Sequence, residues 1–443
     1  MFKDKKIGLI SLGCDKNRVD SERALALCRE KASVTSSLED ANIIIVNTCA
    51  FLESARKEAI DTILECNEFR SKNLEKIVVT GCLPEKFIDE LYDELVEVDV
   101  FLGINDYDLL FNALELAYKG ERVKFVKKNS EIKIKNRILT TPCHYFYLKI
   151  ADGCNNKCTY CLIPKIRGEY RSTKIEDLIE EVKSLGESKE IILVAQDITR
   201  YGVDLYGEPK LVTLIKELSK LDEVNSIRLL YAYPDMISDE LIEEIKNNKK
   251  VINYLDIPLQ HASDGILKKM NRKGTFNEYL SLIDKLKSKV EGIAIRSTFI
   301  TGFPGESKKD FKTLCDFIKK AEFTNCGFFA YSREDGTPAY KLPDQIDEKT
   351  KQKRVKKLYA IQRKISKNYL KKYRGQTIDV VCDGVDYDNQ SFYGRAYFNA
   401  PEIDGKVYFD YGGVIEQGKT YKVKILKTND YDLFGSVEDE FTE

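Results

Sequence analysis

Short apolar runs alternate with amphipathic stretches along the first third of the chain. Residues 6–12, 42–47 and 76–80 are apolar and rich in β-branched side chains, which predicts three strands. Residues 19–30, 52–68 and 85–96 follow them with helix-like spacing. This alternation is typical of a parallel sheet with crossover helices. We therefore expect an N-terminal Rossmann-like α/β domain over residues 1–135.

The same alternation continues with longer intervals through the middle of the chain. Six strand-like runs cover residues 144–150, 190–196, 226–231, 254–258, 292–300 and 325–331. Helix-like segments separate most of them, among them residues 175–185, 211–221, 239–246 and 308–320. Six parallel strands with crossover helices predict an open (β/α)6 partial TIM barrel over residues 140–372, whose chemistry lies at the carboxyl ends of the strands.

The pattern changes again near residue 375. Residues 348–374 form a lysine-rich stretch whose apolar positions share one helical face. Short alternating runs then cover residues 377–382, 392–398, 406–409, 420–426 and 432–437. They predict a small antiparallel β-barrel of five strands over residues 374–443.

Three closely spaced cysteines follow the first strand of the middle domain. Cys154, Cys158 and Cys161 form the pattern C-x-x-x-C-x-x-C. Three thiolates on one loop can hold three irons of a [4Fe–4S] cluster and leave the fourth iron without a protein ligand. A structural zinc site would instead need four ligands. The spacing therefore predicts a cluster with one open iron.

A second set of three cysteines is spread along the N-terminal domain. Cys14, Cys49 and Cys82 each come directly after one of the predicted strands. The carboxyl ends of parallel strands meet at one edge of a sheet, so these thiols should lie together and hold a second cluster. The alternative is that they are small buried hydrophobes. The remaining cysteines lack ligand spacing and are interpreted as structural: Cys28, Cys66, Cys143, Cys315, Cys326 and Cys382.

The composition of the chain indicates in which compartment this chemistry takes place. The chain has 443 residues, a hydrophobic share of 43% and a formal net charge of −1, which does not suggest a general polyanion binder. It contains no apolar run long enough to span a membrane. Twelve cysteines without a secretory signal favour metal ligands in a reducing cytosol over disulfides. We expect a cytoplasmic protein.

The cysteine motif and its surroundings resemble the radical S-adenosylmethionine (SAM) enzymes. The segments SLGCDKN (residues 11–17), NTC (47–49) and GCL (81–83) are similar to the N-terminal domain of methylthiotransferases, and the C-terminal barrel resembles their TRAM domain. The resemblance implies SAM and two [4Fe–4S] clusters as cofactors. It implies that the Cys154/Cys158/Cys161 cluster reduces SAM to generate an adenosyl radical. The Cys14/Cys49/Cys82 cluster then supplies sulfur, and a second SAM supplies the methyl group.

Polar residues near the ends of the middle strands are candidates for binding SAM. An arginine fork suits the SAM carboxylate, and Gln or Asp suits its ribose hydroxyls. No side chain is expected to act as an ordinary acid or base, because the cofactors carry the hard step. For each residue taken singly, loop polarity or a buried salt bridge is an equally good interpretation. The candidates are Gln196, Asp197, Arg167, Ser172, Arg296, Thr298 and His261.

Two branches of methylthiotransferases compete, one modifying an adenosine of transfer RNA. The other, the RimO type, modifies the β-carbon of an aspartate in the small-subunit ribosomal protein numbered twelve. The segments YAYPD (231–235), IPLQHAS (257–263) and YSREDGT (331–337) resemble the second branch. Asp15 and Phe434 depart from it, since proline and tryptophan are common there, but neither is a predicted ligand.

The charge of the C-terminal barrel supports the same branch. Six basic and fourteen acidic residues from Gly375 onward give −8, which should repel RNA and attract a basic protein. The expected partners are the ribosomal protein or the small ribosomal subunit and an electron donor such as flavodoxin or ferredoxin, with no transfer RNA and no membrane. An electron-transfer iron–sulfur protein would use four cysteines per cluster, and a non-catalytic ribosome-binding module would not need six cysteines at strand ends.

Overall fold

The N-terminal part of the chain is a six-stranded parallel sheet with helices on both faces. The computed structural model describes residues 2–127, 136–186 and 189–437. The strand order is β2-β1-β3-β4-β5-β6. The strands are β1 (Lys6–Ser11), β2 (Ser33–Val34), β3 (Ile43–Thr48), β4 (Lys76–Gly81), β5 (Val100–Leu102) and β6 (Val123–Phe125). The helices are α1 (Asp15–Lys31), α2 (Glu53–Asn67), α3 (Cys82–Glu94) and α4 (Leu110–Tyr118), with 3-10 turns at Leu38–Asp40, Glu68–Ser71 and Tyr107–Leu109.

The middle part is an open half-barrel of six parallel strands. The order is β14-β13-β12-β11-β10-β7, so β14 and β7 are free edges. The strands are β7 (Tyr145–Lys149), β10 (Lys189–Val194), β11 (Val224–Leu229), β12 (Val251–Asp256), β13 (Ala294–Thr301) and β14 (Asn325–Ala330). A small antiparallel pair, β8 (Ala151–Asp152) with β9 (Arg171–Ser172), follows β7. The predicted α/β class is confirmed for both units.

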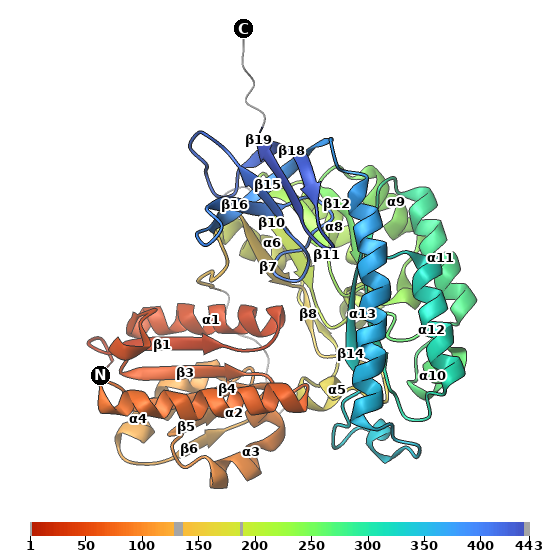
Figure 1. Cartoon of the computed structure of the whole chain (residues 1–443). Coiled ribbons are helices and arrows are strands. Elements are labelled where there is room, and N and C mark those ends of the chain that lie inside the picture. The colour runs from red at the N-terminus through yellow and green to blue at the C-terminus, as the bar shows by residue number, and fades with distance from the viewer. Residues whose placement is uncertain (1, 128–135, 187–188, 438–443) are drawn as a thin grey trace.

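Helices cover the outer face of the half-barrel and enclose its largest apolar core (Figure 1). The longer ones are α6 (Ile175–Ser184), α8 (Leu211–Ser219), α9 (Asp239–Asn247), α11 (Phe276–Lys289), α12 (Lys308–Ala321) and α13 (Glu348–Lys371). Short helices α5 (Ile163–Ile166), α7 (Val203–Tyr206) and α10 (Asp264–Lys269) and 3-10 turns at Ile198–Arg200, Pro234–Met236 and Pro338–Lys341 lie between them. Of the helices in the described ranges, none is both long and apolar enough to cross a membrane.

The C-terminal part is a closed barrel of five strands in the order β15-β16-β17-β19-β18. The strands are β15 (Thr377–Asp386), β16 (Ser391–Arg395), β17 (Val407–Asp410), β18 (Thr420–Thr428) and β19 (Leu433–Val437). The predicted barrel is confirmed, but one detail of its description as antiparallel is wrong, because β17 and β19 run parallel. Strand directions cannot alternate all the way round a closed ring with an odd number of members, so one pair must be parallel.

The barrel packs into the concave face of the half-barrel (Figure 1). Tyr147, Val194 and Tyr254 from the half-barrel share one apolar cluster with Val380 and Phe409 of the barrel. Burying this shared surface is the main driving force for the docking. Polar contacts at the same interface then fix its orientation.

A buried carboxylate bridges the half-barrel and the barrel. Glu190 at the start of β10 accepts hydrogen bonds from Arg228 Nε at 2.6 Å and from Arg395 Nη1 of β16 at 2.8 Å. Although burial opposes ionisation, the two arginines lower the pKa of Glu190 to about 2. Arg228 therefore depends on this carboxylate for charge compensation, and Arg395 is compensated by Glu190 together with Asp383, which lies 2.8 Å from Arg395 Nε.

The change Glu190→Gln should destabilise the protein strongly, by about 3–5 kcal/mol, because it leaves Arg228 without its counter-charge and leaves Arg395 with Asp383 alone. The pKa of Glu190 in the folded protein is lower than its usual value of 4.5. The stability that Glu190 contributes is therefore fully present above about pH 4.5 and is lost as the pH falls toward 2. Chemical denaturation between about pH 2 and 7 measures both effects. The control is Asp379→Asn, whose ion pair with Lys422 on the same barrel is exposed, and it should change stability by less than about 1 kcal/mol. Equal effects of the two changes would contradict this assignment.

Candidate active site

The first cysteine set lies on the loop that leaves the carboxyl end of the half-barrel. The loop begins at Gly153, whose φ is +78°, and a Cβ there would lie 2.0 Å from the Glu169 carbonyl oxygen. Only glycine fits this position. The Cys154 N–H donates to the Gly168 carbonyl at 3.1 Å, so the first thiol is fixed against the segment that follows α5.

The rest of this loop is held by segments near the ends of other strands. The Thr159 N–H and hydroxyl donate to the carbonyls of Met270 and Lys269 at 3.0 and 2.8 Å. The Ala339 N–H donates to the Thr159 carbonyl at 2.9 Å. The loop is therefore held in place by the protein fold itself.

The sulfurs of this set are largely withdrawn from water. Burial raises the pKa of Cys154 to about 11 and that of Cys161 to about 12, and the neighbouring thiols add to both shifts. Cys161 Sγ accepts the Ile163 N–H at 3.4 Å, and Cys158 Sγ lies 3.9 Å from the Tyr233 hydroxyl. Since metal ligation requires thiolates, metal binding at this set must release protons.

The second cysteine set lies at one edge of the N-terminal sheet, as its positions after strands predict. Cys14 immediately precedes α1, Cys49 follows β3, and Cys82 is the first residue of α3. A Cβ on Gly13 would lie 3.1 Å from Cys49 Sγ, so the loop before Cys14 passes directly over Cys49. Burial raises the pKa of Cys82 to about 12, the charge of Arg167 opposes this shift, and the charges of Cys49 and Cys14 add to it. The three thiols therefore share one site.

Asn17 ties the loops of this second set together. Its amide nitrogen donates to the carbonyls of Leu12 and Thr48, each at 3.0 Å, and these residues lie two and one positions before Cys14 and Cys49. Its side-chain oxygen accepts from Cys82 Sγ at 3.7 Å. One buried amide thus touches the backbone or side chain next to each thiol of the set.

A buried arginine links the two sets. Arg167 Nη1 donates to both oxygens of Asp152 at 3.0 and 2.9 Å and to Asp20 Oδ2 at 3.1 Å, and Arg167 Nη2 donates to Asn17 Oδ1. Lys149 Nζ pairs with Asp152 Oδ2 at 3.1 Å and also with Asp20. We call Asn17, Asp20, Lys149, Asp152 and Arg167 the arginine network. It runs from the residue two positions before Cys154 to Asn17 beside Cys82.

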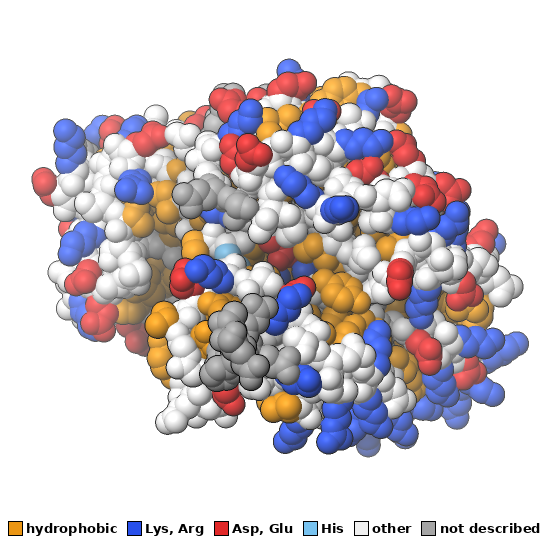
Figure 2. All heavy atoms as spheres, turned by 90° about the horizontal axis from the view of Figure 1, so that it is seen from above, with side chains coloured by type: hydrophobic (Ala, Val, Ile, Leu, Met, Phe, Trp, Pro, Cys, Tyr) orange, Lys and Arg blue, Asp and Glu red, His pale blue; other side chains and the backbone are white. Residues whose placement is uncertain are grey.

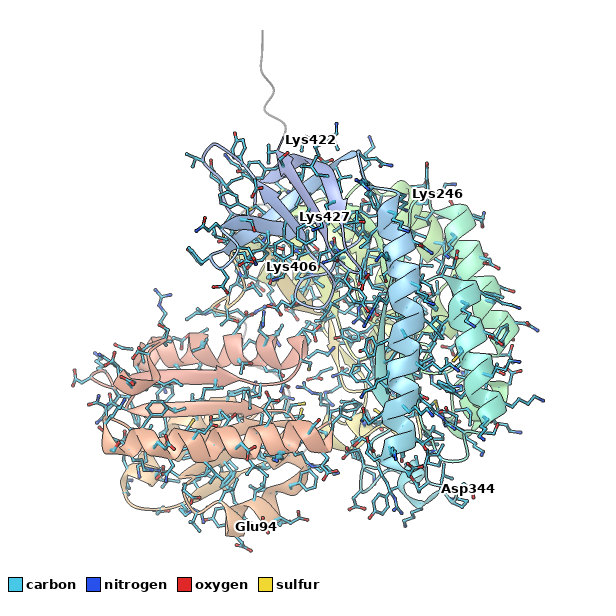
Figure 3. The ribbon with its side chains drawn as sticks, in the orientation of Figure 1. Glu94, Lys246, Asp344, Lys406, Lys422 and Lys427 are labelled. Carbon is cyan, nitrogen blue, oxygen red and sulfur yellow. The ribbon has the colours of Figure 1, made fainter. Side chains whose placement is uncertain are left out.

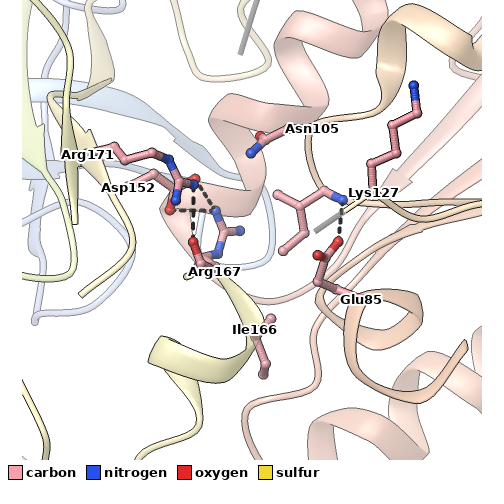
Figure 4. Close-up of a pocket in the computed structure, with 8 residues that line it drawn as sticks. Glu85, Asn105, Lys127, Asp152, Ile166, Arg167 and Arg171 are labelled. Atoms are coloured by element: carbon pink, nitrogen blue, oxygen red, sulfur yellow. Dashed lines mark hydrogen bonds and ion pairs between the residues drawn. The ribbon is translucent and has the colours of Figure 1, made fainter. Parts of the chain in front are cut away.

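A small polar pocket lies against the arginine network, between the N-terminal domain and the half-barrel (Figure 4). Arg167 and Asp152 face one another in this view, with Arg171 beside them. The other lining residues are Glu85, Ile104, Asn105, Lys127 and Ile166.

The two cysteine sets suit clusters better than single ions. Among the described residues, no three His, Cys, Asp or Glu side chains converge on a point where one metal ion could sit. A [4Fe–4S] cluster takes one thiolate at each of three irons, so its ligands lie farther apart than ligands that share one ion. The positive charge of Arg167 beside the second set also favours a negatively charged group there.

The predicted SAM-binding residues differ in how many of their polar atoms already form hydrogen bonds within the protein. Gln196 Nε2 donates to Asp152 Oδ1 at 3.0 Å, and its buried Oε1 has no hydrogen-bond partner in the described part of the chain. Asp197 is fully buried and accepts from Thr199 N at 3.0 Å and from Asn156 Nδ2 at 2.9 Å. Because Asn156 belongs to the first cysteine loop, Asp197 supports that loop directly.

Three of the other candidates are engaged in contacts between elements. Arg167 belongs to the arginine network and lies beside the second cysteine set. Ser172 accepts the Gly202 N–H at 2.9 Å and donates to Asp204 Oδ1 at 2.6 Å. Arg296 pairs with Asp256 at 3.6 Å and with Asp404 of the barrel at 3.3 Å.

Thr298 and His261 lie near the carboxyl end of β13. Thr298 Oγ1 accepts from Arg296 Nη1 at 3.4 Å. His261 is fully buried, its Nδ1 accepts the Ser263 N–H at 2.9 Å, and its Nε2 lies 3.6 Å from Glu306 Oε2. Neither residue contacts a cysteine loop directly in the hydrogen bonds described here.

Sequence reasoning missed the residues that join the two cysteine sets. No site role is predicted from the sequence for Asn17, Asp20, Lys149 or Asp152. Lys149 offered a signal, because a lysine inside the apolar run of residues 145–150 must find a counter-charge when the strand is buried. Arg137 is a second missed residue, fully buried between Glu22 of α1 and Glu181 of α6.

Three family models match separate parts of the chain. The radical SAM superfamily matches residues 148–318, the uncharacterized protein family UPF0004 matches residues 6–103, and the TRAM domain matches residues 375–437. The first range covers most of the half-barrel but not β14, the second covers the N-terminal sheet except β6, and the third covers the C-terminal barrel.

Similar proteins cover the chain from end to end. The ribosomal protein uS12 methylthiotransferase RimO of Clostridium tetani is 47% identical over 439 residues, which is 98% of both chains. The protein of the same name from Acetivibrio thermocellus is 46% identical over 448 residues, covering 98% of this chain and 99% of its own. Among solved structures, the radical SAM methyltransferase TsrM from Kitasatospora setae aligns with a TM-score of 0.55 at 13% identity, over 76% of this chain and 77% of its own, which shows a shared fold. The chain belongs to the RimO family of ribosomal protein uS12 methylthiotransferases.

Proposed function

We propose that this protein transfers a methylthio group to the β-carbon of an aspartate in ribosomal protein uS12. One observation supports this most strongly: two separate sets of three cysteines lie at strand ends, and a buried arginine network connects them. A reaction that generates a radical at one centre and delivers sulfur from another needs both centres near one substrate atom.

Each set would hold one [4Fe–4S] cluster with one iron lacking a protein ligand. The ligands would be Cys154, Cys158 and Cys161 at the first cluster, and Cys14, Cys49 and Cys82 at the second. When bound, the clusters and SAM supply the one-electron, radical and sulfur chemistry that side chains cannot provide. The protein's own contribution is to position these groups and to exclude water from them.

We propose Gln196 as the side chain that binds SAM, because its buried Oε1 has no partner in the described residues and could accept a hydrogen bond from a hydroxyl. Asp197 would act beside it by fixing the loop of Cys154 through Asn156. Arg167 and Ser172 already have protein partners, so we assign them to positioning. His261, Thr298 and Arg296 remain candidates for the wall of the SAM site.

Charge favours a protein substrate at the C-terminal barrel. Residues 375–443, which include the barrel, carry −8, so this part of the chain should attract a basic ribosomal protein and repel transfer RNA. The electron for the first cluster would come from a small carrier such as flavodoxin or ferredoxin.

Incubation of the reduced, iron-loaded enzyme with SAM and either uS12 or transfer RNA tests the proposed reaction. Mass spectrometry should find a methylthio increment on an aspartate of uS12 and none on the RNA. An increment on the RNA alone would refute the proposed substrate, and failure to form 5′-deoxyadenosine would refute the proposed chemistry.

Replacing either cysteine set by alanine should remove about half of the iron. The wild-type protein, reconstituted without oxygen, should bind about eight irons, because each [4Fe–4S] cluster contains four. Cys143→Ser is the matched control, since Cys143 is exposed and close in sequence to Cys154 but outside both sets. Loss of all iron from one triple variant, or a wild-type content of about four, would contradict two independent sites.

Arg167→Leu should uncouple radical formation from product formation. The comparison variant is Arg137→Leu, because Arg137 is also buried and also bridges α1 to the half-barrel through two carboxylates, Glu22 and Glu181. Both changes should lower stability by about 3–5 kcal/mol. Arg167→Lys tests whether the planar guanidinium of arginine is required or whether the point charge of a lysine ammonium is sufficient.

Only Arg167→Leu should alter the second cysteine set. In the metal-free protein, alkylation of Cys49 and Cys82 should become slower in Arg167→Leu, because the positive charge of Arg167 lowers the pKa of both thiols, and it should stay unchanged in Arg137→Leu. In the loaded protein, the ratio of 5′-deoxyadenosine to methylthiolated product should rise in Arg167→Leu alone. If both arginine variants behaved in the same way, Arg167 would have only a general role in holding the domains together and no specific role at the second cysteine set.

A further inference from the structure

The longest helix of the molecule carries a row of lysines that its fold does not require. α13 contains eight lysines and two arginines against one glutamate, which gives +9. Its buried positions Leu358, Gln362, Ser366 and Leu370 pack on the half-barrel side of the helix. Figure 2 shows Lys and Arg side chains gathered at the lower right edge of the molecule, on the side of α12 and α13.

Six of the seven exposed lysines of α13 form a single line. Lys349, Lys353, Lys356, Lys364, Lys367 and Lys371 are all exposed and recur at intervals of three and four residues, with Ala360 at the one skipped position. We call these six residues the lysine stripe. At about 1.5 Å per residue, it extends over roughly 33 Å.

The lysine stripe is barely neutralised by its own protein. In the part of the chain that the structure describes, Lys367 pairs with Asp430 at 3.3 Å, and its other five members form no ion pair. The neighbouring α12 adds five exposed lysines against two aspartates. A line of unpaired like charges is held at an electrostatic cost unless an anion meets it.

We propose that the lysine stripe binds the phosphate backbone of ribosomal RNA, and that the enzyme acts on uS12 beside this RNA in a ribonucleoprotein particle. This inference rests on the proposed function, because it assumes uS12 as the substrate. Lysines act as point charges suited to phosphates, and a line of about 33 Å matches an extended polyanion better than a compact acidic protein. The net charge of −8 over residues 375–443 and of +9 over α13 thus separates a region suited to the basic protein from a region suited to its RNA.

The course of α13 brings both surfaces to one substrate. The segment before the helix contacts the first cysteine loop, where the Ala339 N–H donates to the Thr159 carbonyl at 2.9 Å. Figure 3 places Asp344, four residues before the helix, at the opposite end of α13 from Lys422 of the barrel. At its other end, α13 reaches the barrel through Arg363 and Lys367, which pair with Asp430. RNA lying along the stripe would therefore extend from the side of the first cluster to the barrel.

The test variant changes Lys353, Lys356, Lys364 and Lys371 to glutamine. The matched control changes four exposed lysines on and near α9 and α11 to glutamine: Lys246, Lys249, Lys285 and Lys289. The full-length proteins are titrated with a small-subunit ribosomal RNA transcript at several salt concentrations. The stripe variant should bind at least about tenfold more weakly at 0.1 M salt, and its log–log salt slope should shrink by about 3. The control should match the wild type in both.

A second measurement compares substrates. The wild type should have a higher kcat/KM for uS12 in the small subunit than for free uS12, and the stripe variant should lose only this preference. The inference is overturned if the wild type fails to bind the RNA, or if the stripe variant binds it as tightly as the control. It is also overturned if the only defect of the stripe variant is that an acidic flavodoxin no longer reduces it. If no form of uS12 is modified but the RNA binding behaves as expected, the proposed function fails and the RNA-binding surface stands.

Discussion

The guanidinium of Arg167 lies between two carboxylates that come from different domains, Asp20 on α1 and Asp152 next to the first cysteine loop. A cation buried this completely has to keep both partners, because losing one would leave an uncompensated charge. The contact therefore allows few ways of docking the N-terminal sheet against the half-barrel. Asn17 extends the constraint to the loops of Cys14, Cys49 and Cys82. The relative position of the two cysteine sets depends on this one arrangement of charges.

The rest of the structure surrounds the two cysteine sets and forms the outer surfaces of the molecule. The C-terminal barrel closes the concave face of the half-barrel with an apolar contact and a buried Arg–Glu–Arg bridge. Residues 375–443, which include this barrel, carry a net charge of −8. α13 runs along β14, the free edge of the half-barrel, and presents lysines on its outer face. These opposite net charges are the basis for the proposal that the target combines a basic protein with RNA.

The sequence predicted most of the framework because local patterns determine it. β1, β4 and β14 begin at the predicted residues, and both cysteine sets lie at strand ends, where parallel topology gathers them. Helix boundaries were less accurate. The third helix begins at Cys82, three residues before the predicted start, because Pro84 is tolerated in a first turn whose N–H groups need no partner. The very short strands β2, β5, β8 and β9 have too few residues to show a period.

The partners of the polar residues could not be predicted, since they depend on contacts distant in sequence. Asp20 and Arg167 are separated by 147 residues, and nothing near either of them indicates the other. The side chains of Arg296 and Ser172, both predicted SAM-binding residues, contact Asp404 and Asp204, and no pattern near either residue indicates these partners. The type of a residue and its position at a strand end together restrict the candidates for SAM binding. Only the folded chain shows which polar atoms lack a hydrogen-bond partner, as Gln196 Oε1 does in the described residues.

The most direct test of the central claim is the electron paramagnetic resonance spectrum of the anaerobically reconstituted, dithionite-reduced protein. If the arginine network holds the two cysteine sets close together, the two reduced clusters should interact magnetically. The broadening from this interaction should vanish when either set is replaced by alanine. A wild-type spectrum equal to the simple sum of the two single-cluster variants would contradict the account.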